Sequence, residues 1–343
     1  MRGAAIVVGV IGALAFAGWI VMAAFGMQVM PSYLAAWLFW LAIPVGALPL
    51  VMGLEFAGAG LTPLATALRP LLLLMPVAAV FVIPVLVRIG PLYPWAATPQ
   101  HGMAATWFST AFFVVRAILY LIVWTGLALA FARRPSRLEG RRGLAAFGLG
   151  LHLAVGTLAA TDWALSLDLS LGSSEFGFLV IAAQCSLALA AALLVNPAAW
   201  RDPALLTQFA WLTLALLGAW VFLQFTQFLV VWSADLPREI VWYQRRDGGL
   251  GFAVEWFGFS VAALALLLLA PLSLARRLPG MVAALAGLIL LMHLFEMLWL
   301  VTPNFRGHFA ITFADVLAMA GIGGLVLAAT QALRGRELPH GHA

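Results

Sequence analysis

The sequence predicts an all-α, polytopic membrane protein with about ten transmembrane helices. Hydrophobic residues make up 64% of the 343-residue chain and charged residues only 9%, and the mean hydropathy is +1.06. Apolar runs of about 20 residues, the length that crosses a hydrocarbon core, recur along the whole chain. Because the polar segments between these runs are short, we expect residues 1–343 to form a single integral membrane domain.

The predicted helices follow from these runs and from the segments that separate them. The first run is too long for a normal signal-peptide core, so we expect a retained helix. Longer segments with Trp or acidic residues follow the third, fifth and seventh runs (90–102, 162–175 and 233–249), and arginines follow the fourth, sixth and eighth. The predicted helices cover 4–25, 33–55, 70–88, 107–132, 143–163, 176–196, 206–232, 250–272, 280–301 and 309–332.

The middle eight helices divide into two possible four-helix units, 33–163 and 176–301, flanked by helices 4–25 and 309–332. In each unit a long loop with Tyr and Trp follows the second helix, and the fourth helix carries a histidine, His152 or His293. Parallel repeats of this kind occur in membrane proteins. The pattern therefore favours two four-helix bundles plus two further helices.

All basic residues apart from histidine are arginines, and most fall in the short loops on one side of the predicted membrane. That side includes Arg2, Arg69, the 133–142 loop, Arg201 and the pair Arg276–Arg277. The positive-inside rule then predicts that both termini are cytoplasmic. The same rule explains the pI near 10.3 without nucleic-acid binding, so membrane lipid is the expected surrounding.

A small set of ionisable side chains lies within or at the ends of the apolar runs, where an unpaired charge costs several kcal/mol, on the order of 3 or more. Each is therefore a functional hypothesis. The set is Glu55, Arg116, His152, Asp162, Glu255, His293, Glu296 and Asp315.

The depths of these residues suggest a proton pathway. Glu55 lies at the inner end of its helix and His152 near mid-depth, while the others lie toward the outer side. The i, i+3 spacing of His293 and Glu296 puts them on one helix face, within reach of a shared proton. Carboxylates and histidines are the groups that relay protons in membranes. The alternative is that the charged groups pair with one another and only fix helix packing.

Other site types have weaker support. A His and Glu pair at this spacing occurs once, whereas helical di-iron sites need it twice, so no metal site is predicted. A single cysteine, Cys185, excludes a CxxCH haem attachment, so no covalently bound cofactor is expected. Prolines within predicted spans (Pro44, Pro49, Pro76 and Pro84) permit the kinked helices of a proton-coupled secondary transporter.

Several stretches resemble one family, the ActF-type membrane subunit of bacterial alternative complex III, which is related to the NrfD-type polysulfide-reductase anchors. They are RIGPLYPWA (88–96) with FFVVRAILYLIVW (112–124), TDWALSLD (161–168) and QFLVVWSADLPREIVWYQRR (227–246). Their order and spacing are similar to the family's. The chain departs from it after Asp168, where LSLGSS replaces the usual Pro and Trp.

The resemblance implies a cofactor-free subunit of a respiratory quinol-oxidising complex in the bacterial inner membrane. Such a subunit is expected to contribute a proton pathway and part of a quinone or quinol pocket. It implies as partners an NrfD-like membrane subunit, iron–sulfur and cytochrome c subunits, and a terminal oxidase in some arrangements. A structural scaffold of an oxidase-associated complex is a further alternative. Besides Arg116 and Asp162, the motif residues are Asp168, Asp235, Arg238, Glu239, Trp242 and Arg245.

Overall fold

The protein is built of helices, and among the described residues ten helical segments are long and apolar enough to cross a membrane. The computed structural model describes residues 2–98, 100–133, 141–196 and 202–336, and these residues contain no strand. The predicted all-α, polytopic fold with ten spans is therefore confirmed. Residues 134–140 of the arginine-rich loop, and Arg201, lie outside the described residues.

Nine spans are continuous helices whose ends lie within a few residues of those predicted. They are α1 (Arg2–Ala24), α2 (Met30–Phe56), α9 (Thr110–Ala132), α10 (Arg141–Trp163), α11 (Phe176–Leu194), α12 (Pro203–Ala234), α14 (Leu250–Leu269), α16 (Pro279–Val301) and α18 (Phe313–Arg336). Short helices connect them: α6 (Ile89–Leu92), α7 (Pro94–Ala97), α8 (Met103–Trp107), a 3₁₀ turn η1 (Leu165–Leu167), α13 (Pro237–Gln244), α15 (Leu272–Arg277) and α17 (Pro303–Arg306).

The third span differs from the single helix predicted over 70–88. It begins earlier and is broken into α3 (Pro63–Leu72), α4 (Met75–Val80) and α5 (Ile83–Val87). Pro76 and Pro84 stand in the first turns of α4 and α5, where a missing N–H costs little but the preceding helix cannot continue. At these breaks the Trp37 indole and the Tyr33 hydroxyl, both on α2, donate to backbone carbonyls of the broken span.

Helix α2 lies at the centre of the molecule and packs against α10, α11, α16 and α18. Its buried residues cover every face, as expected for a helix that is apolar all round. The closest approach is to α11 at Gly46, where a Cβ would overlap the backbone carbonyl of Gln184. Pro44 and Pro49 lie inside α2 without breaking it.

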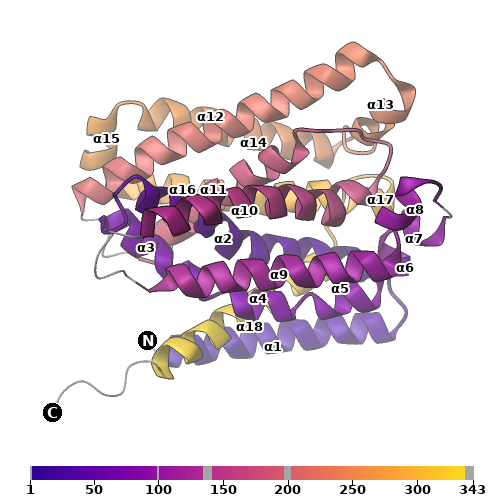
Figure 1. Ribbon diagram of the computed structural model, residues 1–343, viewed down its shortest axis with the longest axis horizontal. Helices are drawn as coiled ribbons and strands as arrows, with labels where there is room; N and C mark the ends of the chain where they lie inside the picture. Colours follow the sequence, from indigo (N-terminus) through magenta and orange to yellow (C-terminus); the bar gives the residue numbers. More distant parts are fainter. Residues whose placement is uncertain (1, 99, 134–140, 197–201, 337–343) are drawn as a thin grey trace.

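The first and last spans, α1 and α18, form an antiparallel pair through facing glycines, Gly12 and Gly324. Close packing at small residues is common between membrane helices. Figure 1 shows that α1 begins and α18 ends at the same end of the molecule. We call this the terminal end and the opposite one, which carries α7, α8, α13 and α17, the distal end. That the terminal end is cytoplasmic stays a prediction.

Candidate functional site

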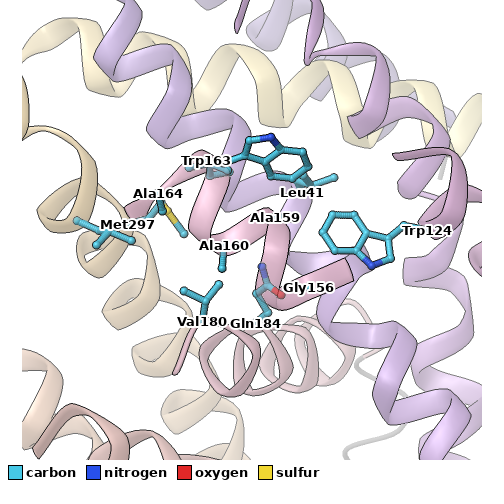
Figure 2. Close-up of a pocket in the computed structure, with 12 residues that line it drawn as sticks. Leu41, Trp124, Gly156, Ala159, Ala160, Trp163, Ala164, Val180, Gln184 and Met297 are labelled. Atoms are coloured by element: carbon cyan, nitrogen blue, oxygen red, sulfur yellow. The ribbon is translucent and has the colours of Figure 1, made fainter. Parts of the chain in front are cut away.

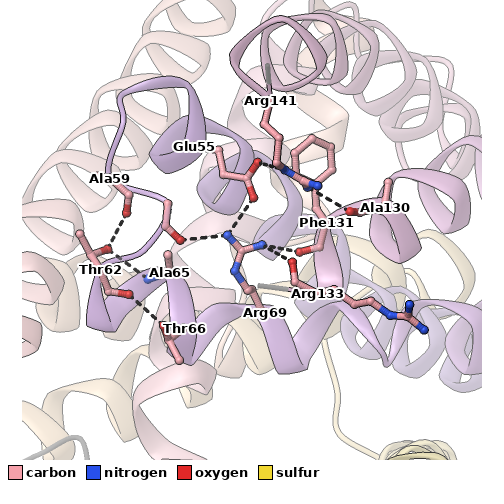
Figure 3. Close-up of polar contacts among 11 residues, drawn as sticks. Glu55, Ala59, Thr62, Ala65, Thr66, Arg69, Ala130, Phe131, Arg133 and Arg141 are labelled. Carbon is pink, nitrogen blue, oxygen red and sulfur yellow. Dashed lines mark hydrogen bonds and ion pairs between the residues drawn. The ribbon is translucent and has the colours of Figure 1, made fainter. Parts of the chain in front are cut away.

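At the terminal end, Glu55 is fully buried between two arginines (Figure 3). Its Oε1 accepts from Arg69 Nη2 and its Oε2 from Arg141 Nε, each at 2.8 Å. Arg69 also donates to the carbonyls of Gly60 and Phe131. Because both carboxylate oxygens are engaged, this triad ties α2 and α3 to the ends of α9 and α10.

At the distal end, Asp162 on α10 is held by Arg116 on α9. Arg116 Nε and Nη2 donate to the two carboxylate oxygens at 2.7 and 2.9 Å. The Tyr120 hydroxyl and the Trp107 indole donate to the same carboxylate at 2.9 and 3.1 Å, and the guanidinium lies 4.1 Å from the Trp107 ring. Asp162 therefore accepts four hydrogen bonds in a closed, buried network.

Two more acidic residues at the distal end pair with arginines. Asp315 accepts from both Nη1 and Nη2 of Arg306 at 2.9 Å, which closes the loop between α16 and α18. Asp168 accepts from Arg245 Nη1 at 2.6 Å, which ties the end of α13 to the loop after α10. These contacts match the alternative in which charged groups fix helix packing.

The motif 227–246 contains one residue that sequence reasoning missed, Arg246. It is 1% exposed and donates to the carbonyls of Trp242, Trp299 and Leu300 and to Asn304 Oδ1. Burial lowers its pKa to about 9, so the guanidinium remains charged at neutral pH. Three of its four partners lie on residues more than 50 positions away in the sequence, so the sequence alone does not reveal its role.

The other motif residues of this loop lie around α13. The Trp242 ring stacks on the Arg246 guanidinium, with 3.7 Å from the carbon to the ring centroid. Glu239 is buried and lies 3.7 Å from the exposed Arg238. Asp235 is exposed and ends α12 in a left-handed conformation, with φ at 48°. The motif thus builds the distal loop rather than a cluster of its own.

The predicted contact between His293 and Glu296 on α16 is present. His293 Nδ1 lies 2.6 Å from Glu296 Oε2, and its Nε2 lies 2.6 Å from the Ser186 hydroxyl on α11. Glu296 Oε1 also accepts from the indole of Trp220 and the amide of Gln224 on α12, at 2.7 and 3.2 Å. The pair therefore combines an acid and a base without an arginine.

The Glu296 carboxylate lines a cavity of about 630 Å³ between α12, α13, α14 and α16. Aromatic side chains dominate the walls, and the polar groups are Gln224, Tyr243, Asp247, Glu255 and Glu296. The aromatic residues are Trp220, Phe225, Phe228, Phe252, Trp256, Phe259 and Trp299. Volume and lining are those of a site for a small organic ligand.

A polar connection leads from this cavity toward the distal end. Tyr243 lines the cavity, and the Gln227 side chain lies beside it. The Ser173 hydroxyl, in the loop after α10, donates to Gln227 Oε1 at 2.9 Å. Burial raises the pKa of Tyr243 to about 12, so its hydroxyl keeps its proton at neutral pH.

His152 stands apart from all of these groups. It is fully buried, and neither ring nitrogen has a hydrogen-bond partner. The structure thus joins His293 to Glu296 and places Glu255 on their cavity, but leaves Glu55, Asp162 and Asp315 in separate arginine networks. The predicted proton pathway would have connected these three acidic residues with His152, His293 and Glu296.

These features define a multi-pass membrane protein with an aromatic, acid-lined cavity beside a hydrogen-bonded histidine–glutamate pair. In the described part of the chain, no group of three or more His, Cys, Asp or Glu side chains could hold a metal ion. Neither a protein-family model nor a curated protein matches this sequence.

Proposed function

We propose that this chain is a cofactor-free subunit of a respiratory quinol-oxidising complex in the bacterial inner membrane. Its α12–α14–α16 cavity binds a quinone headgroup, and the Glu296–His293 pair takes up or delivers the protons of that quinone. The observation that carries the proposal is the position of Glu296, which faces the cavity and contacts His293 at once.

The chemistry of a quinol fits this lining. A quinol is a flat, apolar ring with two hydroxyl groups, and its oxidation releases two electrons and two protons. The aromatic walls suit the ring, while Glu255 and Glu296 offer carboxylates to the hydroxyls. The electrons pass to partner subunits, for which the resemblance suggests iron–sulfur and cytochrome c proteins beside an NrfD-like membrane subunit and a terminal oxidase.

The Glu296–His293–Ser186 chain can hold the proton in two ways. With Glu296 ionised, its carboxylate only accepts, so His293 Nδ1 donates to it and Nε2 accepts from Ser186. When a proton arrives, Nε2 becomes a donor and the Ser186 hydroxyl turns to the Ala183 carbonyl, 3.0 Å away.

The test measures the binding of a short-chain quinol analogue to the purified protein through quenching of tryptophan fluorescence, since Trp220, Trp256 and Trp299 line the cavity. Glu296→Gln removes a charge-assisted hydrogen bond, so we expect Kd to rise about tenfold or more. Asp235→Asn, at an exposed position outside the cavity, is the matched control. Equal affinity of Glu296→Gln and wild type contradicts the proposal.

The transporter alternative expects a discontinuous helix beside the ligand site. The structure has a broken span, but its middle segment α4 packs against α2, α9 and α18, whereas the cavity is lined by α12, α13, α14 and α16. The geometry therefore favours the quinol-linked function.

A further inference from the structure

A second, smaller cavity lies among α2, α9, α10, α11 and α16 (Figure 2). Its volume is about 30 Å³, and most of its wall is apolar, including Leu38, Leu41, Ala159 and Leu300. Besides the indole of Trp163, two polar side chains, Trp124 from α9 and Gln184 from α11, also line it. Buried polar atoms in such an apolar environment are normally hydrogen-bonded.

Both polar side chains present buried atoms that no protein group satisfies. Trp124 is 1% exposed, and its Nε1 donor has no acceptor. The Oε1 acceptor of Gln184 has no donor. A buried donor and a buried acceptor on the wall of one cavity are the arrangement that an ordered water molecule joins.

His152 lies close to this cavity, although it is not one of the residues that line it. Its ring centroid lies 6.1 Å from that of Trp124, and both of its nitrogens lack a partner. Gly156, one turn further along α10, lines the cavity. A Cβ at Gly156 would lie 3.9 Å from His152 Nε2, so this glycine keeps the imidazole edge open toward the cavity.

We propose that this cavity binds ordered water, held by the indole of Trp124, the amide of Gln184 and the imidazole of His152. The volume suffices for about one or two water molecules, since one needs about 10–15 Å³. Water accepts from the Trp124 N–H and donates to Gln184 Oε1 and to whichever nitrogen of His152 carries no proton.

The site gives His152 a hydrated contact within the membrane-spanning region. The Glu55 and Asp162 carboxylates are occupied by arginines, so neither pairs with this imidazole. The unpaired atoms lie around the small cavity, so water binding there is independent of quinone binding in the large one.

The test is proton-detected solid-state NMR of the full chain in phospholipid bilayers. Trp124→Phe identifies the Trp124 indole signal by its disappearance. In the wild type we expect magnetisation transfer from water to this indole proton, although the residue is buried. No transfer from water would overturn the proposal.

Two further variants locate the water. Gln184→Met keeps the side-chain length but removes the amide, so transfer to the Trp124 indole is lost. Gly156→Ala places a methyl group beside His152 and against the flexible end of Ile181, so transfer to the His152 ring falls while that to Trp124 remains. Leu41→Met, a conservative change on the same wall, leaves both unchanged. Full transfer in Gln184→Met would also overturn the proposal.

Discussion

Two acidic residues, the buried Asp162 on α10 and the partly buried Glu296 on α16, use opposite kinds of partner. Asp162 is held by the fork of Arg116, and the Tyr120 hydroxyl and Trp107 indole complete its shell. Glu296 contacts a histidine and two neutral donors, and it faces a cavity of about 630 Å³.

The partners decide what each carboxylate can do. An arginine does not release its proton in proteins, so Arg116 keeps its positive charge beside Asp162 and their network holds helices together. A histidine changes its charge near neutral pH, and the cavity gives Glu296 access to a ligand. Burial alone therefore does not identify a proton-transferring residue, whereas the type of partner does.

The largest effect is expected from Asp162→Asn. The change leaves Arg116, which is 5% exposed, as a buried charge without its counter-ion, and breaking one member of such a pair costs about 3–5 kcal/mol. We expect a large fall in the thermal unfolding temperature in detergent and poor recovery of folded protein.

The control for Asp162→Asn is Asp235→Asn, at an exposed position whose left-handed backbone Asn tolerates. It should change the free energy of unfolding by no more than about 0.5 kcal/mol. A wild-type unfolding temperature for Asp162→Asn would mean that the Arg116 network is not structural.

Arg116→Lys should come second. Lysine keeps the positive charge but lacks the planar fork that meets both Asp162 oxygens and the Trp107 carbonyl. We expect a loss of about 1.5–3 kcal/mol in the free energy of unfolding, the range for a hydrogen bond to a charged group. Chemical denaturation in mixed micelles measures it. A loss as large as that of Asp162→Asn would show that shape, rather than charge, dominates.

Glu296→Gln should affect ligand binding more than stability, in contrast to the two changes in the Asp162 network. The amide oxygen still accepts from Trp220 and Gln224, so we expect the free energy of unfolding to fall by only about 1 kcal/mol. Quinol-analogue binding should nevertheless weaken, as stated above. If stability falls as far as in Asp162→Asn, the two carboxylates play the same structural role and the scaffold alternative gains support.

The sequence predicted the ten spans because each is an apolar run of membrane-crossing length. The breaks in the third span were not predicted. The sequence does not distinguish Pro44 and Pro49, which lie inside the continuous helix α2, from Pro76 and Pro84, at which the third span is broken. The packing of neighbouring side chains decides which helix is interrupted. The spacing of His293 and Glu296 predicted their contact.

Contacts between distant residues were beyond the sequence. Nothing in the chain links Ser186 to His293 or Arg69 to Glu55, because helix rotation and packing decide which faces meet. The large cavity depends on three helices and the α13 loop together.

Ser186→Ala should have the smallest effect on ligand binding, with a loss of stability similar to that of Glu296→Gln. The change removes the 2.6 Å contact to His293 Nε2 and leaves that nitrogen buried without a partner, which costs about 1 kcal/mol. Ser233→Ala is the matched control, because its hydroxyl likewise bonds a carbonyl three residues back but is exposed. Both variants are compared by thermal unfolding and quinol-analogue binding. If Ser186→Ala and Ser233→Ala behave alike, Glu296 alone orients His293, and the proton route ends at the imidazole instead of reaching α11.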